Sequence, residues 1–470
     1  MLVLPCRAKL LLSPKELHQA FLTCEQNQLQ NCTQIISISL EIDRVDPLVV
    51  LHKFAKPDQL NFYFENKNKG EAIAAIDAVA KLELEGKERF SNAQRFINSC
   101  LASIIPVGTI DRPFAGPHFF CSFSFFDENA QADYPFSAGT VFLPRWQVAC
   151  KGDRCVLVAN LVIKPGENLQ IILQDFWNKL QKISLAKNSA STNTIYQQEF
   201  SKQDVAATDN FKRAVISCLE SIRNNRLSKI VLAHALDVSS GVPFNLFESL
   251  KNLRRLHPNC YVFSTSSGKG QNFIGASPER LMSIHNQELM TDAMAGSAPR
   301  GKTSAEDTEL GNLLLSSEKE RHEHQVVTDF ITQHLYQLGI KPTLLSPRLR
   351  QLSNIQHLWT PIHAKVPANV HPLEIVAELH PTPAVAGVAR DIAMKDIRRY
   401  ESFERGLYAA PLGWVDYQGN SEFIVGIRSA LIDGSSARLY AGAGIVGGSD
   451  PDKELAEIQL KLQALLKALV

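Results

Sequence analysis

The chain of 470 residues is 45% hydrophobic and 21% charged, the balance of a globular protein with a large core, and its length suggests roughly two or three domains. The net charge of +1 provides no electrostatic footprint for nucleic acid or an acidic membrane surface, so we expect neither as a partner. No apolar run is long enough to span a membrane, and the N-terminus lacks the basic and apolar regions of a secretory signal. We therefore expect a cytoplasmic protein.

The nine cysteines all lie between Cys6 and Cys260, and none belongs to a Cys-x-x-Cys pair. Cys150 and Cys155 are nearest to each other in the sequence, and no histidines lie nearby to complete a metal site. An odd number of scattered cysteines predicts free thiols in a reducing compartment and argues against zinc.

The N-terminal half, residues 1–200, predicts alternating strands and helices without evident chemistry. An aromatic strand is expected at 61–65 and a buried strand at 119–126, whereas the spacing of apolar residues predicts a helix over 71–84. The polar stretch 186–199, rich in Ser, Asn and Thr, is the best candidate for a connection between this half and a second region, although a long surface loop is an equal alternative to a domain boundary.

The second region, residues 205–470, begins with a predicted helix over 209–225 and a strand over 228–238, with Lys229 as its second residue. A lysine at this place is commonly an edge-strand residue that blocks unwanted pairing. The longest predicted helix covers 308–338. Its Glu320 and Glu323 share one face, although most charged residues on long helices are simply solvated.

A further strand is predicted over 421–430, with Arg428 inside it. Near the C-terminus, flexible glycines follow a strand over 438–441, and a helix then begins near Pro451 with Ser449 or Asp450 as its cap.

On that helix Glu454, Glu457 and Lys461 share one face, beside the bare backbone of Gly442 and Gly444. This combination would suit an anionic ligand held together with a hard cation, although a Glu–Lys pair on a helix can equally be an ordinary surface pair. The glycine spacing also matches the dinucleotide fingerprint by letter. That site needs a second parallel strand after its helix, which we do not expect here.

Seven ordered motifs together resemble the chorismate-utilising enzymes, and among them the isochorismate synthases. The resemblance covers roughly residues 205–470, with a weaker match in the N-terminal half. The motifs are Lys229 in Lys-Ile-Val-Leu-Ala, Glu279 in Gly-Ala-Ser-Pro-Glu, Gly296 in Ala-Gly-Ser-Ala-Pro-Arg-Gly, Glu323-His324, Leu-His-Pro-Thr-Pro-Ala-Val at 379–385, Glu404-Arg405-Gly406-x-Tyr408, and the stretch from Gly442 to Glu457.

The resemblance implies an α/β (α+β) fold in which antiparallel β-sheets pack as a sandwich-like core surrounded by helices, with the active site in a cleft. It also implies Mg²⁺ as the cofactor. Glu323 and Glu457 match the direct ligands, and Glu320 and Glu454 match residues that act through water. Oxygen ligands and several retained waters are what Mg²⁺ prefers. Spacing alone does not rank Glu454 against Glu457.

Chorismate carries two carboxylates, so its site needs cationic or N–H-rich groups. By resemblance, Arg428 and Tyr408 take the enolpyruvyl carboxylate with help from the backbone near Gly444, and Lys461 takes the ring carboxylate. The other positions that match the substrate site are Gly296, Ser297, His357 and Ala384.

The implied reaction adds water at ring C2 and removes the C4 hydroxyl, which requires a base and an acid on opposite sides of the ring. Lys229 matches the base and Glu279 the acid. A neutral lysine and a protonated glutamate are both favoured by desolvation, so we expect both side chains to be buried when substrate is bound.

The ammonia-using relatives carry Gln at the place of Lys229, or a nucleophilic Lys at the place of Ala295. Salicylate synthases share Lys229, Glu279 and His357 but carry Thr where this chain has Ala384. The pattern therefore favours an isochorismate synthase. The long N-terminal half resembles that of the quinone-pathway enzymes, which implies that the product feeds quinone (menaquinone or phylloquinone) synthesis. The alternatives are a salicylate synthase, a siderophore-pathway isochorismate synthase, an anthranilate synthase component and a non-catalytic carboxylate-binding protein. We expect a monomer or a weak homodimer.

Overall fold

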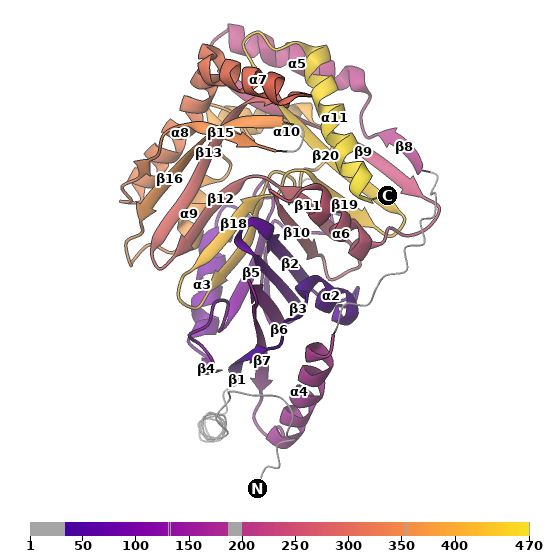
Figure 1. Ribbon diagram of the computed structural model, residues 1–470, viewed down its shortest axis with the longest axis vertical. Helices are drawn as coiled ribbons and strands as arrows, with labels where there is room; N and C mark the ends of the chain where they lie inside the picture. The colour runs from indigo at the N-terminus through magenta and orange to yellow at the C-terminus, as the bar shows by residue number, and fades with distance from the viewer. Residues whose placement is uncertain (1–32, 130, 132, 187–199, 353–354, 470) are drawn as a thin grey trace.

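The computed structural model describes residues 33–129, 131, 133–186, 200–352 and 355–469. Within these residues, hydrogen bonds link 20 strands into one continuous, mostly antiparallel network (Figure 1). Helices lie around this network, and several of them gather over its upper end. This arrangement confirms the expected α/β (α+β) class with an antiparallel core. The expected connection at 186–199 lies almost wholly outside the described residues.

The strands differ widely in length, from two residues to fourteen. They are β1 (Gln34–Ile42), β2 (Asn61–Asn66), β3 (Glu71–Leu84), β4 (Ile104–Gly108), β5 (His118–Phe123), β6 (Gly139–Lys151), β7 (Arg154–Ile163), β8 (Phe200–Asp204), β9 (Lys229–Ser240), β10 (Tyr261–Ser266), β11 (Asn272–Ser277), β12 (Arg280–His285), β13 (Glu288–Pro299), β14 (Thr343–Leu344), β15 (Arg348–Gln351), β16 (Ile355–Lys365), β17 (Pro411–Asp416), β18 (Ser421–Val425), β19 (Ser429–Asp433) and β20 (Ser436–Val446).

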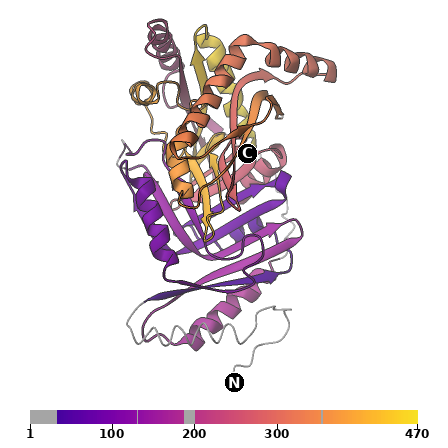
Figure 2. The same ribbon diagram turned by 90° about the vertical axis from the view of Figure 1, so that its left-hand side faces the viewer.

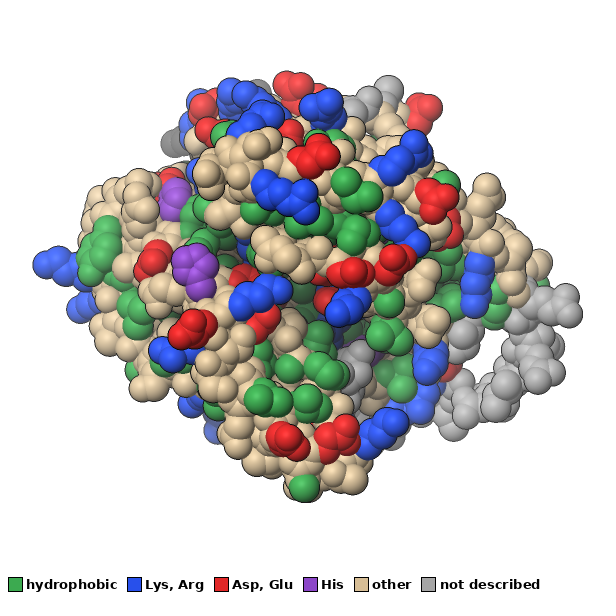
Figure 3. Space-filling model, turned by 90° about the horizontal axis from the view of Figure 1, so that it is seen from above, with side chains coloured by type: hydrophobic (Ala, Val, Ile, Leu, Met, Phe, Trp, Pro, Cys, Tyr) green, Lys and Arg blue, Asp and Glu red, His purple; other side chains and the backbone are tan. Residues whose placement is uncertain are grey.

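The helices carry apolar stripes that pack on the strands. They are α2 (Pro47–Phe54), α3 (Arg89–Leu101), α4 (Leu169–Ser184), α5 (Thr208–Arg223), α6 (Leu246–Leu256), α7 (Ser304–Ser316), α8 (Glu318–Gln337), α9 (Pro372–Leu379), α10 (Arg390–Tyr400) and α11 (Pro451–Leu469), with a 3-10 turn, η1, at Lys67–Lys69. None of the described helices combines the length and the apolar character that a membrane span requires. Seen from above, lysine and arginine side chains are interspersed with acidic ones, in keeping with the small net charge (Figure 3).

Strands from the two halves of the chain pair directly with each other. β10 pairs antiparallel with β2, and β17 pairs antiparallel with β5. The N-terminal strands form the lower layers in Figure 2, and the strands and helices of the second region rise above them. The N-terminal half therefore supports the strands of the second region, and the division into residues 1–200 and 205–470 stays a prediction.

The helix predicted over 71–84 is wrong, because this segment is the strand β3. It pairs with β2 on one side and β6 on the other. Its first part is buried on both faces, so it lacks the apolar–polar alternation of a half-buried strand. A bulge between Ala78 and Ala80 follows Asp77, whose φ is +62°, and it breaks the period-two pattern again. The pairing partners overrode a spacing that is typical of helices.

The long helix predicted over 308–338 is two helices, α7 and α8, which meet at Ser317. The Ser317 side chain accepts a hydrogen bond from the Glu320 backbone N–H and caps α8. The break places Glu320 in the first turn of α8 and Glu323 one turn later. Helix position therefore directs both carboxylates toward the end of β13, on which α8 packs.

The expectation that all cysteines are free thiols is wrong for one pair. Cys150 and Cys155 form a disulfide, with their Cα atoms 4.1 Å apart. They stand directly opposite each other in the β6–β7 hairpin, and this cross-strand position brings the two sulfur atoms within bonding reach. The other described cysteines, Cys100, Cys121, Cys218 and Cys260, are free.

Arg405 joins several elements of the second region at its centre. Its side chain is fully buried, and its Nε atom donates to the Glu401 carboxylate at 2.7 Å. Its Nη atoms donate to the carbonyl oxygens of Val385 and Val231, and the guanidinium lies 4.3 Å from the centre of the Phe125 ring. A buried ion pair, together with hydrogen bonds to two backbone carbonyl oxygens, holds the loop before α10 against β9.

Replacing Arg405 by alanine should lower the free energy of unfolding by about 3–5 kcal/mol, because the Glu401 carboxylate would remain buried without its counter-charge. Urea unfolding followed by circular dichroism measures this change. The matched control is Arg399→Ala in the neighbouring helix α10, where the side chain is exposed and the change should stay within about 0.5 kcal/mol. Equal stability of the two variants would contradict the role given to Arg405.

Candidate active site

The β9–β20 ladder positions the first group of site residues. Lys229, at the start of β9, pairs with Val446 at the end of β20. Gly442 and Gly444 lie inside β20 and pair with β9, so the expected flexible glycine segment is wrong at these two positions. A Cβ atom at Gly444 would lie 3.3 Å from Lys229 Cε and 3.7 Å from Glu323 Oε1. The bare glycine thus makes room for these two side chains.

α11 begins as its sequence predicts and carries the second group. The Asp450 side chain accepts hydrogen bonds from the N–H groups of Asp452 and Lys453, which caps the helix. Further along, Lys461 Nζ lies 2.7 Å from Glu457 Oε1 and donates to the Gly442 carbonyl oxygen at 2.8 Å. Lys461 therefore ties α11 to the glycine strand. It is more than a surface partner of Glu457.

α8 and β13 supply the third group. Lys229 Nζ lies 2.7 Å from Glu323 Oε1, and Glu320 Oε2 accepts a hydrogen bond from the Ser297 N–H at 3.1 Å. Gly296 is the bulged residue of β13, with φ at +77°, and a Cβ there would crowd Glu320. Burial raises the pKa of Glu320, and the charge of Glu323 raises it further, against the Ser297 hydrogen bond.

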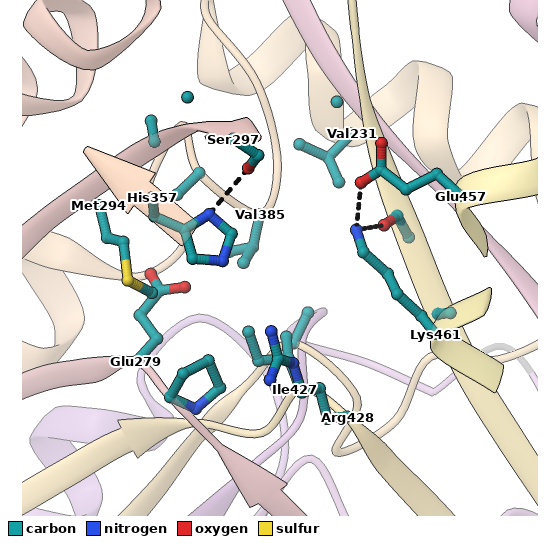
Figure 4. Close-up of a pocket in the computed structure, with 18 of the residues that line it drawn as sticks. Val231, Glu279, Met294, Ser297, His357, Val385, Ile427, Arg428, Glu457 and Lys461 are labelled. Atoms are coloured by element: carbon teal, nitrogen blue, oxygen red, sulfur yellow. Dashed lines mark hydrogen bonds and ion pairs between the residues drawn. The ribbon is translucent and has the colours of Figure 1, made fainter. Parts of the chain in front are cut away.

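These groups surround one cavity of about 150 Å³. Glu320 and Glu454 do not line it. In Figure 4, Glu279 and His357 lie toward one side of the cavity and Glu457 with Lys461 toward the other. The site residues expected from the sequence that line the cavity are Lys229, Glu279, Gly296, Ser297, Glu323, His357, Ala384, Tyr408, Arg428, Gly444, Glu457 and Lys461.

Glu279 is held in the short connection between β11 and β12. Its backbone N–H donates to Ser277 Oγ at 3.1 Å, and only 6% of the residue is exposed. Burial raises the pKa of its carboxyl group to about 7. The charge of Asp292 raises it further, whereas the charges of Lys229 and Arg350 oppose the shift. Lys229 is also buried, with 4% exposed. A carboxyl group with this pKa can hold a proton near neutral pH and donate it.

His357 is a partly buried, neutral imidazole in the same cavity. Its Nδ1 atom lies 2.7 Å from Ser297 Oγ, as the dashed line in Figure 4 shows. Burial lowers the pKa of His357 to about 3, and the nearby charges of Arg428 and Lys461 lower it further. This histidine therefore offers a hydrogen-bonding group without a charge.

Arg428 does not lie within a strand as expected. It occupies the link between β18 and β19, with φ at +52°, in the left-handed region that non-glycine residues rarely adopt. Burial lowers the pKa of its guanidinium, opposed by the nearby thiol of Cys260. Backbone strain of this kind often occurs where a side chain must be directed into a functional site.

The cavity also contains residues that the sequence did not single out, including Met294, Ile427 and Tyr440. The ring of Tyr440 stacks on that of Tyr408, with the ring centres 5.2 Å apart. Tyr440, Gly442 and Gly444 alternate along β20 and so face the same side of the strand. Treating the glycines as part of a strand would have identified Tyr440 from sequence.

The carboxylates of the site fit a cation that is completed by other ligands. Among the described residues, no group of three or more His, Cys, Asp or Glu side chains lies close enough to form a metal site by itself. Glu323 and Glu457 nevertheless face one cavity, and each is paired with a lysine ammonium. Mg²⁺ is usually held by one or two carboxylates together with waters and substrate oxygens, so this donor set suits it.

Comparison with known proteins identifies the family of this chain. The family described as "Chorismate binding enzyme" matches residues 17–470. The chain belongs to this family.

Two relatives match nearly the whole chain. The salicylate biosynthesis isochorismate synthase of Pseudomonas aeruginosa is 33% identical over 93% of this chain and 90% of its own length. The isochorismate synthase MenF of Bacillus subtilis is 31% identical over 93% of this chain and 94% of its own length. Both alignments therefore include the N-terminal half, in which the sequence motifs of the family are harder to detect.

Solved structures show the same architecture. The menaquinone-specific isochorismate synthase MenF of Escherichia coli aligns with a TM-score of 0.77 and 26% identity, covering 97% of this chain and all of that one. Anthranilate synthase component I of Streptococcus pneumoniae aligns with a TM-score of 0.69 at 18% identity, which supports the shared fold alone.

The raised pKa of Glu279 predicts how stability changes with pH. Between pH 4.5, its ordinary pKa, and pH 7, the folded protein keeps a proton that the unfolded chain has lost. The free energy of unfolding should therefore fall as the pH rises through this window, and Glu279 should contribute up to about 3 kcal/mol of this fall. Glu279→Gln should remove this contribution. The free energy of unfolding of the variant, relative to that of the wild type, should therefore increase from pH 4.5 to pH 8 in urea titrations. A constant difference would contradict the assigned pKa.

Proposed function

We propose that this protein is an isochorismate synthase, which converts chorismate to isochorismate by adding water at C2 and removing the C4 hydroxyl. The observation that carries the proposal is one cavity in which Lys229 and the proton-holding Glu279 lie with two further cations, Arg428 and Lys461. A base, an acid and two carboxylate-binding cations match this substrate and reaction. The isochorismate synthases among the relatives support the same activity.

The two carboxylates of chorismate determine its orientation in the cavity. Arg428 and Tyr408, with the backbone near Gly444, take the enolpyruvyl carboxylate. Lys461 takes the ring carboxylate, helped by the backbone of Gly296 and Ser297. Cationic and N–H groups compensate the charge that a dianion brings into a buried site.

The acid–base chemistry follows from the two buried groups. To act as the base, Lys229 would first give up the proton that it holds in the pair with Glu323, and it would then accept a proton from water as the water oxygen bonds to C2. Glu279 gives its proton to the C4 hydroxyl, which leaves as water while the ring double bonds shift. The pKa of about 7 lets Glu279 carry that proton near neutral pH. His357 and Ala384 complete the wall around the ring.

The proposed cofactor is Mg²⁺, held by Glu323 and Glu457 directly and by Glu320 and Glu454 through water. When bound, the ion would neutralise the ring carboxylate and the clustered glutamates. Burial raises the pKa of Glu454, and the charge of Glu457 raises it further, as expected for carboxylates that need a nearby cation.

We also propose that the product feeds quinone synthesis (menaquinone or phylloquinone). The aligned menaquinone-specific structure supports this assignment. Supply of isochorismate for salicylate is the second candidate, because a relative bears that name. A cytoplasmic location and a monomeric or weakly dimeric state also belong to the proposal.

Incubating the protein with chorismate and Mg²⁺ tests the reaction, with products separated by chromatography. Isochorismate is expected. Salicylate with pyruvate would identify a salicylate synthase, and the absence of any product would contradict an enzymatic role.

Lys229→Ala should lower kcat by at least about 100-fold, the scale of a general base. Near-wild-type turnover of this variant would show that Lys229 is not the base.

Removal of Mg²⁺ by a chelator should abolish turnover, and added Mg²⁺ should restore it. Glu323→Gln and Glu457→Gln should weaken Mg²⁺ binding more than Glu320→Gln and Glu454→Gln, for which a loss of about 10–100-fold is typical of residues that orient ligands. Activity titrated against Mg²⁺ concentration measures this order. Glu318→Gln, on the exposed start of α8, is the control and should bind Mg²⁺ like the wild type. The reverse order would exchange the roles of direct and water-mediated ligands.

A further inference from the structure

The pair formed by Lys229 and Glu323 separates two cavities. It lines the catalytic cavity on one side and a second cavity of about 160 Å³ on the other. The second cavity is bounded by Val326 of α8, Val388 and Val446. Lys229 Nζ and Glu323 Oε1 are 2.7 Å apart, so one pair of side chains forms the partition.

The second cavity opens to solvent and is small. Ser228, Lys319 and His322 lie at its rim, and all three are exposed. Its volume lies below the roughly 300–1,000 Å³ of typical small-molecule sites, although it has room for water molecules. Polar groups at the rim and valines along the walls suit a short passage that water enters and a ring-sized molecule does not.

The catalytic cavity has a different neighbour at its other end. An apolar groove of about 340 Å³ shares Ser297, Arg428, Glu457 and Lys461 with it. These residues are the proposed carboxylate-binding residues and a proposed metal ligand, so chorismate would enter from the groove. Once bound, the substrate would fill the space between the groove and Lys229.

The reaction requires one water on the lysine side of the ring in every turnover. Its oxygen bonds to C2 and its proton passes to Lys229, while the C4 oxygen leaves as water with the proton of Glu279. One water is consumed and one released, on opposite faces of the ring. The consumed molecule therefore needs a route to Lys229 that bound chorismate does not block.

We propose that the second cavity is the inlet for the nucleophilic water. Water enters between the three valines and reaches Lys229, which lines both cavities. Gly447, also without a side chain, is part of the lining of the second cavity. The inlet rests on the proposed isochorismate synthase activity.

The test blocks the cavity reversibly in the full-length protein. Val388→Cys is labelled with methyl and then with benzyl methanethiosulfonate, and the labels are removed with dithiothreitol. Steady-state kinetics with chorismate and Mg²⁺ are measured before labelling, after it and after removal. The benzyl label should lower kcat by at least about tenfold and leave KM within about twofold, since it obstructs water and not substrate. The methyl label should have a smaller effect, and dithiothreitol should restore kcat.

Ile392→Cys provides the matched control, because this exposed residue lies four positions further along the chain and does not line the cavity. It carries the same native cysteines, so any effect of labelling those appears in both proteins. Val446→Cys, on another wall of the cavity, repeats the test independently.

Unchanged kcat after benzyl labelling at both Val388 and Val446 would overturn the inlet. A rise in KM that parallels the fall in kcat would overturn it too, because the label would then act on the substrate site. If the unlabelled protein forms no isochorismate, the proposed function itself fails, and this result is distinct from either effect of the label.

Discussion

The pairing of β9 with β20 is the constraint on which the rest of the site depends. It runs from Ser239 opposite Ser436 to Lys229 opposite Val446, and it places the lysine beside the bare backbone of Gly444. A strand-bound lysine has a defined position, whereas a lysine on a flexible loop would not. The same ladder presents the Gly442 carbonyl to Lys461 and so determines where α11 packs. A sheet register thereby joins the proposed base, the glycines and a proposed carboxylate-binding cation.

Charge balance explains how such a polar cavity persists inside a folded protein. Each inward-facing glutamate of the proposed metal site is matched by a lysine at 2.7 Å, whereas Glu279 is buried without a direct ion pair to any residue that the structure describes. Burying charges is unfavourable unless they are compensated, which raises the pKa of the unpaired carboxyl group. Desolvation destabilises the charged groups of the site, and it also raises the pKa of Glu279, as its proposed role as an acid requires. A dianionic substrate with a divalent cation would enter this arrangement with nearly balanced charge.

Many elements of the fold and of the site could be predicted because interactions between residues close in the sequence determine them. The cap at Asp450, the shared face of Glu454, Glu457 and Lys461, and the strand beginning near Lys229 depend on neighbours within a few residues. The failures arose where partners far along the chain decided the outcome. Segment 71–84 became a strand because β2 and β6 flank it, and the β6–β7 hairpin brought Cys150 to Cys155. Helical spacing and cysteine spacing contain no information about such partners.

The sequence alone determined the chemical repertoire of this protein: a candidate base, an acid, paired glutamates, carboxylate-binding cations and a glycine-rich strand, in an order that resembles chorismate-utilising enzymes. Only the tertiary structure decided which of them share a cavity and which do not. It brought Glu323 and Glu457 to one cavity and placed Glu320 and Glu454 outside its lining. It also gave Arg428 a left-handed backbone and added Tyr440. The physical reason is that helix and strand periodicity set the face a residue occupies, whereas packing between distant elements sets what that face meets.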